Sequence, residues 1–250
     1  MKIAVKINLL LIGVIIFSSC SKNDDTIDDD QSNTFENPEL PFVEKTYTIV
    51  DTDVTGFYSN SSIISKPTLD EDYYGQDAHY IGNQPSYTDN GDGTITDNNT
   101  GLMWEKDMGA KISFEEGKSK ASNSSIGNYN DWRVPTIKEL YSLILFTGSV
   151  KGESAIQLFI DTNYFNQPLG NTSIGEREID AQTWTSTEYV GKTMNAEATV
   201  FGVNFIDGRI KGYPKNNPRT GNANSMYFRM VRGNTDYGKN NFIDNKDGTI

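Results

Sequence analysis

Few residues of this 250-residue chain are of the types that carry covalent or metal chemistry. There is one cysteine, Cys20, and one histidine, His79. A zinc site of the Cys/His type needs several such ligands, and a Ser-His-Asp triad needs a histidine beside its serine. Residues 85–233 contain no histidine, so this stretch can form neither site. Asp and Glu residues are plentiful, but no spacing between them singles out a pair for general acid–base catalysis. We therefore expect no enzyme activity and no cofactor.

The strongest binding candidate is the stretch 208–220, which contains bases but no acid. Guanidinium and ammonium groups beside an aromatic ring are suited to sulfated or carboxylated glycans. A solvated basic loop without a ligand is the alternative interpretation. The candidate residues are Arg209, Lys211, Tyr213, Lys215 and Arg219.

Two further groups of side chains are weaker candidates. Trp184 with Glu188 would stack on a sugar ring if the indole is exposed, whereas a buried Trp184 is simply core. The oxygen-rich stretch with Asp89, Asn90, Asp92 and Asp97 is similar to a calcium loop. However, Thr88 stands where the first ligand should be and no Glu closes the loop, so hairpin turn chemistry explains these residues better than a metal site.

The N-terminus has the layout of a signal peptide. Lys2 and Lys6 precede the apolar run Leu9–Phe17, and two serines lead to Cys20. The run is shorter than the roughly 20 residues that span a bilayer. An uncleaved anchor and a core helix are the alternatives. The stretch 17–20 resembles a lipobox, which implies a lipid on Cys20 and anchoring in the outer membrane of the cell envelope. Residues 22–25 resemble a surface-export signal, or are a solvated charged run.

Charge is distributed unevenly along the chain. Residues 21–84 carry 14 acids and 3 bases, whereas residues 85–233 carry 17 acids and 15 bases. An acidic leader repels nucleic acid, so we exclude DNA and RNA as partners. Residues 21–44, which are polar and acidic, are predicted to be a disordered tether.

The elements that must position the candidate residues follow from turn and cap signals. Tyr47–Val50 reads as a first strand. Asn90-Gly91 and the stretch 98–101 predict two turns of a three-stranded meander that ends at Trp104. Ser113 with Glu116 and Thr136 with Glu139 form two capping boxes. The second box begins a helix whose apolar face is Ile137, Leu140, Tyr141 and Ile144, and which ends before Gly148.

The remaining sequence predicts strands. We expect Trp104, Trp132 and Trp184 to fill the core, and Asp207-Gly208 to form a turn. Strands, then helices, then strands indicate an α+β fold with a mostly antiparallel sheet and two helices. The later strands are expected at Gln182–Glu188, Thr199–Phe205, Arg209–Gly212 and Met226–Arg232.

One sequence recurs near the end of the chain. Residues 87–95 read YTDNGDGTI and residues 242–250 read FIDNKDGTI. The similarity predicts the start of a second similar domain. We expect a signal peptide at 1–20, a tether at 21–44, a domain at 45–233 with its core at 85–233, and a linker with the start of the next domain at 234–250.

Five motifs in order resemble the C-terminal domain of the collagen-like adhesin Lcl, a family of unknown function. They are DNGDGTITDNNTGLMWEKD, DWRVPTIKELYSLI, TWTSTEY, VNFIDGRI and FRMVRG. The resemblance covers about residues 85–233 and implies a C-type lectin-like fold, a surface location and, as in the adhesin, binding of sulfated glycans. A structural or protein-interaction module of the cell envelope is the alternative. The cysteines of the similar formylglycine-generating enzymes and the Glu-Pro-Asn and Trp-Asn-Asp signatures of C-type lectins are missing, so neither activity is expected.

Overall fold

The computed structural model describes residues 47–150, 155–193 and 197–250. These belong to one compact unit, Glu44–Ile250. The expected signal peptide, Cys20 and the acidic tether therefore lie outside the described residues. Within the described part of the chain, no helix is long and apolar enough to cross a membrane.

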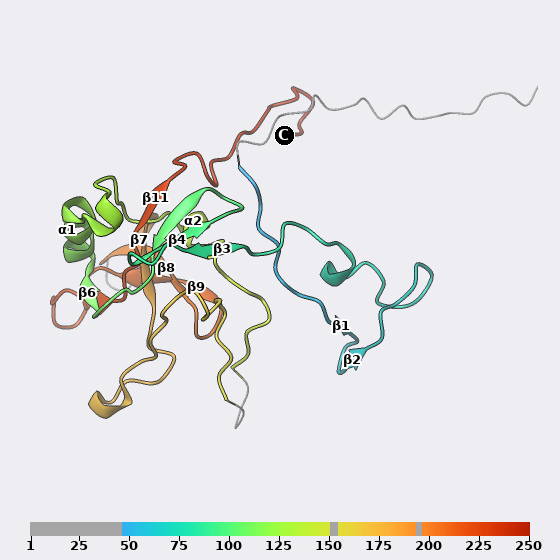
Figure 1. Ribbon diagram of the computed structural model, residues 1–250, viewed down its shortest axis with the longest axis horizontal. Coiled ribbons are helices and arrows are strands. Elements are labelled where there is room, and N and C mark those ends of the chain that lie inside the picture. Colours follow the sequence, from blue (N-terminus) through green and yellow to red (C-terminus); the bar gives the residue numbers. More distant parts are fainter. Residues whose placement is uncertain (1–46, 151–154, 194–196) are drawn as a thin grey trace, which may run out of the picture. The chain divides into compact units, whose positions relative to one another are not determined.

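The structure is α+β, and its strand pairs are antiparallel (Figure 1). A four-stranded sheet has the order β11-β5-β4-β3, and a three-stranded sheet has the order β7-β8-β9. The two helices are α1 (Phe114–Asn123) and α2 (Ile137–Tyr141). The strands are β1 (Phe57–Tyr58), β2 (Ile63–Ile64), β3 (Tyr87–Asp89), β4 (Thr94–Asp97), β5 (Leu102–Glu105), β6 (Ile112–Ser113), β7 (Thr183–Thr193), β8 (Glu197–Asn204), β9 (Arg209–Pro214), β10 (Ser225–Met226) and β11 (Val231–Gly233); short 3-10 turns are η1 (Asp77–His79), η2 (Ile126–Asn128) and η3 (Thr172–Ile174).

The predicted meander is confirmed in β3, β4 and β5. Its first turn is closed by the Asn90 amide, which donates to the Thr94 carbonyl oxygen at 3.1 Å. Gly91 and Gly93 have φ values of +75° and +89°. Glycine adopts this left-handed backbone without steric cost, so the two glycines fix the turn.

Both predicted capping boxes are present. The Ser113 hydroxyl accepts from the Glu116 amide at the start of α1, and Thr136 accepts from Glu139 at the start of α2. Each glutamate bonds back to the backbone of its cap residue, which satisfies amides that the first helical turn leaves unpaired.

The second helix is shorter than predicted, because it ends at Tyr141. Leu143 and Ile144 are nevertheless buried. The Leu145 amide donates to the Phe159 carbonyl oxygen at 3.0 Å, so the chain leaves helical geometry to join the 157–160 segment. Of the predicted apolar face, Leu140 and Ile144 are buried, whereas Ile137 and Tyr141 are only partly buried.

Strand β8 lies at the centre of its sheet and is buried on both faces. Val200 and Val203 have no exposed surface, and neither does Asn204. Gly202 packs under the ring of Tyr213 on β9, where a Cβ atom would come within 3.0 Å of two ring carbons. Glycine here allows the aromatic ring to lie directly on the strand.

Two strand predictions were wrong in detail. Tyr47–Val50 contains no strand, only an isolated bridge from Val50 to Asn83. The closing segment 226–232 is divided between β10 and β11, which belong to different sheets. Between them, the side chain of Arg229 is completely buried.

The three tryptophans are core residues, as predicted. Trp104 and Trp184 have no exposed surface and Trp132 is 4% exposed. Trp184 and Trp132 pack in one cluster with Phe114 and Phe228, while Trp104 packs with residues of α2 and β8 in another. These clusters fix the sheets on which the candidate site lies.

The repeated sequence forms the same turn twice. Asn245 donates from its amide to the Thr249 carbonyl oxygen at 3.2 Å, as Asn90 does to Thr94. The Asp247 carboxylate accepts from the amide and hydroxyl of Thr249 at 2.9 and 2.6 Å. Asp92 accepts from the same two groups of Thr94, at 3.1 and 2.6 Å.

Candidate functional site

A pocket of about 350 Å³ lies at the turn between β8 and β9. Asp207 and Arg209 line it together with Ile179, which comes from the long loop before β7. The Asn204 side-chain amide donates to the Ile179 carbonyl oxygen at 2.8 Å and so fixes the loop against the end of β8. The pocket therefore combines residues far apart in the sequence.

Asp207 is the electrostatic centre of this pocket. Its side chain is 5% exposed and lies 3.0 Å from the Lys211 ammonium and 3.6 Å from the Arg209 guanidinium. One carboxylate thus faces two cations. The Arg209 side chain remains 66% exposed, so its outer donors are open to solvent and to a ligand.

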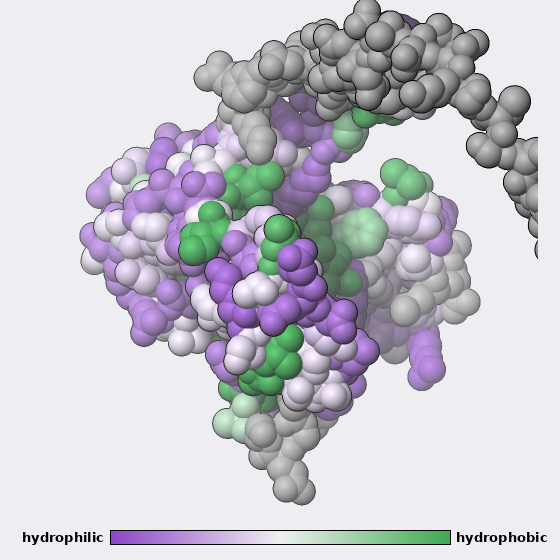
Figure 2. Space-filling model, turned by 90° about the vertical axis from the view of Figure 1, so that its right-hand side faces the viewer, coloured by the Kyte–Doolittle hydropathy of each residue, from purple (hydrophilic) through white to green (hydrophobic). Residues whose placement is uncertain are grey.

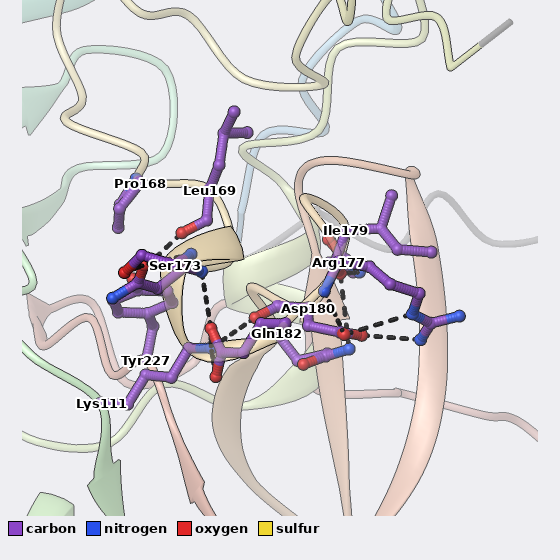
Figure 3. Close-up of polar contacts among 12 residues, drawn as sticks. Lys111, Pro168, Leu169, Ser173, Arg177, Ile179, Asp180, Gln182 and Tyr227 are labelled. Atoms are coloured by element: carbon purple, nitrogen blue, oxygen red, sulfur yellow. Dashed lines mark hydrogen bonds and ion pairs between the residues drawn. The ribbon is translucent and has the colours of Figure 1, made fainter. Parts of the chain in front are cut away.

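The loop that carries Ile179 is held from below by Lys111 (Figure 3). The Lys111 ammonium donates to both Glu176 carboxylate oxygens at 2.6 Å and to the Asp180 carbonyl oxygen at 2.5 Å. These bonds hold the pKa of Glu176 below its usual value. At Gly170 a Cβ atom would lie 1.9 Å from the Arg177 carbonyl oxygen, so only glycine fits this close approach.

Arg177 is a cation of the site that the sequence did not indicate. It forms a bidentate ion pair with Asp180, and Figure 3 shows Lys111 and Arg177 on opposite sides of Asp180. The hydrogen bonds to Asp180, and more weakly the charge of Asp207, raise the pKa of Arg177. The Arg177 side chain is 71% exposed. Because Arg177 is far in sequence from 208–220, the sequence gave no signal that the charge of Asp207 acts on it.

The bases of 208–220 do not form one continuous patch. Arg209 and Lys215 are six residues apart on an extended chain, which places them roughly 20 Å apart. Lys215 instead pairs with Glu188 at 2.8 Å and lies 4.4 Å from the Phe114 ring centroid. Arg219 is exposed in the turn that follows, where its amide donates to Asn217. The structure thus separates Lys215 and Arg219 from the pocket.

Tyr213 contributes to the core more than to the surface. Its ring packs on the cluster that contains Trp184, and its hydroxyl is buried without a hydrogen-bond partner among the described residues. Burial raises the pKa of this hydroxyl. A ligand in the pocket therefore has no access to the phenol oxygen.

The prediction that Trp184 stacks on a sugar must be corrected. The indole has no exposed surface, and its Nε1 donates to the Ile112 carbonyl oxygen at 3.1 Å. Only the core interpretation of Trp184 fits this burial. Glu188, further along β7, is exposed and holds Lys215.

The oxygen-rich residues near 90 act within their own turns. Asp89 accepts from the Gly91 amide and pairs with Lys106 at 2.5 Å. Asp97 is completely buried and accepts from the Asn99 and Thr100 amides. Asn90 and Asp92 bond to Thr94, as described above. No cluster of three or more His, Cys, Asp or Glu side chains suited to a metal ion occurs in the described ranges.

Residues 93–232 match the Lcl C-terminal domain family. No curated protein and no solved structure matches the chain.

Proposed function

This chain belongs to the Lcl C-terminal domain family, and on that premise we propose that it is a non-catalytic module that binds an anionic glycan or another anionic surface polymer. The binding site in this proposal is the pocket beside Arg209. Its ligand is recognised through sulfate or carboxylate groups, because guanidinium groups bind such oxyanions in a bidentate manner.

The observation that carries the proposal is the exposure of two arginines, Arg209 in the lining of the pocket and Arg177 on the loop that carries Ile179. The side chains of Arg177 and Arg209 are 71% and 66% exposed, and both lie within the electrostatic reach of Asp207. Asp180 and Asp207 orient the two guanidinium groups without covering their outer donors. Within these ion pairs, three cations, counting Lys211, face two carboxylates, which leaves one positive charge in excess among the paired groups.

Such a site has a defined electrostatic behaviour. An excess of one charge at an exposed pocket gives weak attraction, and salt screens it over a Debye length of about 8 Å at physiological ionic strength. We therefore expect binding to weaken as the salt concentration rises. We also expect strong binding only when several repeats of one polymer chain bind several copies of the module at once.

The test is binding of the purified chain to immobilised heparin, with desulfated heparin as reference, at low and physiological salt. The double substitution Arg177→Gln/Arg209→Gln should weaken binding at least about tenfold. Lys192→Gln/Arg219→Gln is the matched control, because it also removes two charges, from exposed residues that do not line the pocket; it should bind like the wild type. If both variants lose the same affinity for heparin, the loss reflects net charge alone, and the proposed site is wrong.

The second candidate function is a structural or protein-interaction module of the cell envelope. Loop 167–182 favours it, since this loop is held rigidly by Lys111 yet presents Ile174 with 72% exposure. A folded chain that binds no sulfated or carboxylated glycan, but crosslinks to a protein through residue 174 in intact cells, would support this alternative over glycan binding.

We also propose that the protein is a lipoprotein of the outer membrane, anchored through Cys20 and directed to the cell surface. The apolar run before Cys20 and the single thiol of the chain support this proposal. Growth with labelled palmitate should label the wild-type protein and leave a Cys20→Ser variant unlabelled. Labelling of both proteins would refute the anchor.

Two finer structural proposals remain. The arrangement of two helices and antiparallel sheets around a long loop supports a C-type lectin-like topology, which a crystal structure would test by comparison with that fold. The matching turns at 90–94 and 245–249 support the start of a second module after residue 234. Limited proteolysis of the full-length protein should then release two fragments that each resist further digestion.

A further inference from the structure

Residues 53–81 form a segment whose two ends lie side by side, and this segment is here called the tyrosine lobe. Asp51 joins the two ends of the lobe. Its amide donates to the Asn83 carbonyl oxygen at 2.8 Å, and its carboxylate accepts from the Gly82 amide at 2.5 Å. The lobe ends before residue 93, where the family match begins. It is therefore an addition to the matched domain.

Polar bonds and aromatic stacking hold the lobe together. Gln76 both accepts from the Tyr58 amide and donates to the Tyr58 carbonyl oxygen, each at 2.9 Å, and it also donates to the Tyr73 carbonyl oxygen at 2.8 Å. The His79 ring lies 4.6 Å from the rings of Phe57 and Tyr74. These bonds use the backbone of Tyr58 and Tyr73, and the two residues are 50% and 42% exposed.

The surface of the lobe is unusually apolar. Tyr58, Tyr73, Tyr74 and Tyr80 are 42–64% exposed, and Ile63, Leu69 and Ile81 are 71–86% exposed. In the view of Figure 2, which faces the side of the molecule that carries β1 and β2, hydrophobic side chains appear as separate groups on a mostly hydrophilic surface. Large apolar side chains gathered on one small ordered segment are typical of a site that another molecule covers.

Charge limits the kind of molecule that fits. The lobe contains five acids and one lysine. Asp70, Glu71 and Asp72 stand directly beside Tyr73 and are exposed. The faces of tyrosine rings are themselves negative and attract cations, arginine above all. Rings and carboxylates thus complement a positively charged, planar side chain with an aliphatic stem.

We propose that the tyrosine lobe is a docking site for an arginine-rich segment of a partner protein. Guanidinium groups stack on the exposed rings and bond to the neighbouring carboxylates, while the aliphatic residues cover the stems of the arginines. This site is separate from the pocket at Arg209, which takes anions. The two sites therefore attract partners of opposite charge.

The experiment is fluorescence anisotropy of a labelled octa-arginine peptide with the whole purified chain. The substitution Tyr58→Ala/Tyr73→Ala/Tyr80→Ala should weaken binding at least about fivefold. The matched control Tyr58→Phe/Tyr73→Phe/Tyr80→Phe keeps the rings and should bind within about twofold of the wild type. Neither variant changes the charge, so attraction to the acidic residues 21–44 is equal in all three proteins.

Two outcomes would overturn the proposal. The first is equal binding by the alanine variant, which would show that only the acidic charge attracts the peptide. The second is an uncharged glycan that binds through these tyrosines while octa-arginine does not. Arg177→Gln/Arg209→Gln should not weaken octa-arginine binding, because it removes only positive charge, which separates this test from that of the glycan site.

Discussion

Lys111 and Glu176, 65 residues apart in sequence, form an ion pair in which the ammonium lies 2.6 Å from both carboxylate oxygens. The same ammonium reaches the Asp180 carbonyl oxygen. A lysine side chain thus occupies the centre of an oxygen-rich loop, where it neutralises the charge and fixes the loop. The geometry of the candidate site, including Arg177 and Ile179, depends on this one cation.

Replacement of Lys111 by methionine should loosen the loop while leaving the sheets intact. The pair is partly buried, and its loss leaves Glu176 without its cation, so the free energy of unfolding should fall by about 1–2 kcal/mol. Trypsin should cut after Arg177 faster in Lys111→Met than in the wild type. Lys118→Met, which removes an exposed pair with Glu115, is the control. Equal cleavage rates in the wild type and Lys111→Met would contradict the proposed role of Lys111.

The same pair predicts a pH dependence. Hydrogen bonds from Lys111 hold the pKa of Glu176 in the folded protein below its usual value near 4.5. A lowered folded pKa adds stability above the unfolded pKa, and this stability is lost as pH falls through the folded pKa. The difference in urea midpoint between the wild type and Glu176→Gln should therefore be full at pH 6–7 and shrink toward pH 3. A difference that grows on acidification would disprove this.

Arg229 should be the most sensitive basic residue of the chain. It has no exposed surface and donates to three carbonyl oxygens, those of Glu105, Lys106 and Asn166. Burial lowers its pKa to about 10, so it stays charged at neutral pH. Arg229→Ala should cost about 3–5 kcal/mol in unfolding free energy. Arg229→Lys should not restore it, because an ammonium lacks the planar fork.

The matched control for Arg229 is Arg219→Ala, which removes an exposed arginine and should change stability by less than about 0.5 kcal/mol. Chemical denaturation with a fluorescence readout measures all three variants. Similar stability of the two alanine variants would show that the carbonyl contacts of Arg229 contribute little.

Tyr213→Phe should preserve or improve stability, in contrast to most core substitutions. The buried hydroxyl has no partner among the described residues, so its removal relieves a desolvation cost of about 1 kcal/mol. Heparin binding should be unchanged, since the phenol oxygen does not face the pocket. Thermal unfolding measures the stability of Tyr213→Phe, and the heparin assay measures its binding. If Tyr213 instead binds the ligand, the stability should stay constant and the binding should fall.

Local signals predicted much of the fold. Both capping boxes, the meander and the Asp207-Gly208 turn depend on a few neighbouring residues, and each occurs where the sequence placed it. The burial of Trp104 and Trp132 followed from residue type alone. The family was also recognisable, because its motifs are these same turns, caps and core residues.

The site was harder to predict because it depends on contacts across the chain. Asp207 lies just outside the acid-free stretch 208–220, yet it faces the bases at the start of that stretch. Arg177 does not line the pocket but lies on the loop that carries Ile179 and that Lys111 fixes. The burial of Trp184 was open in sequence because a tryptophan beside polar residues fits both a core and a sugar platform. Contacts between residues far apart in the chain produce no periodic pattern in the sequence.

The turn at 90–94 has a consequence for the order of folding. Its twin at 245–249 forms the same bonds although no sheet flanks it, so five residues are sufficient to specify this conformation. A hairpin nucleus of such short range closes within about 1–10 μs, long before strands such as β5 and β11 meet. The meander should therefore form first and serve as the template on which β11, more than 120 positions downstream of β5, completes the sheet.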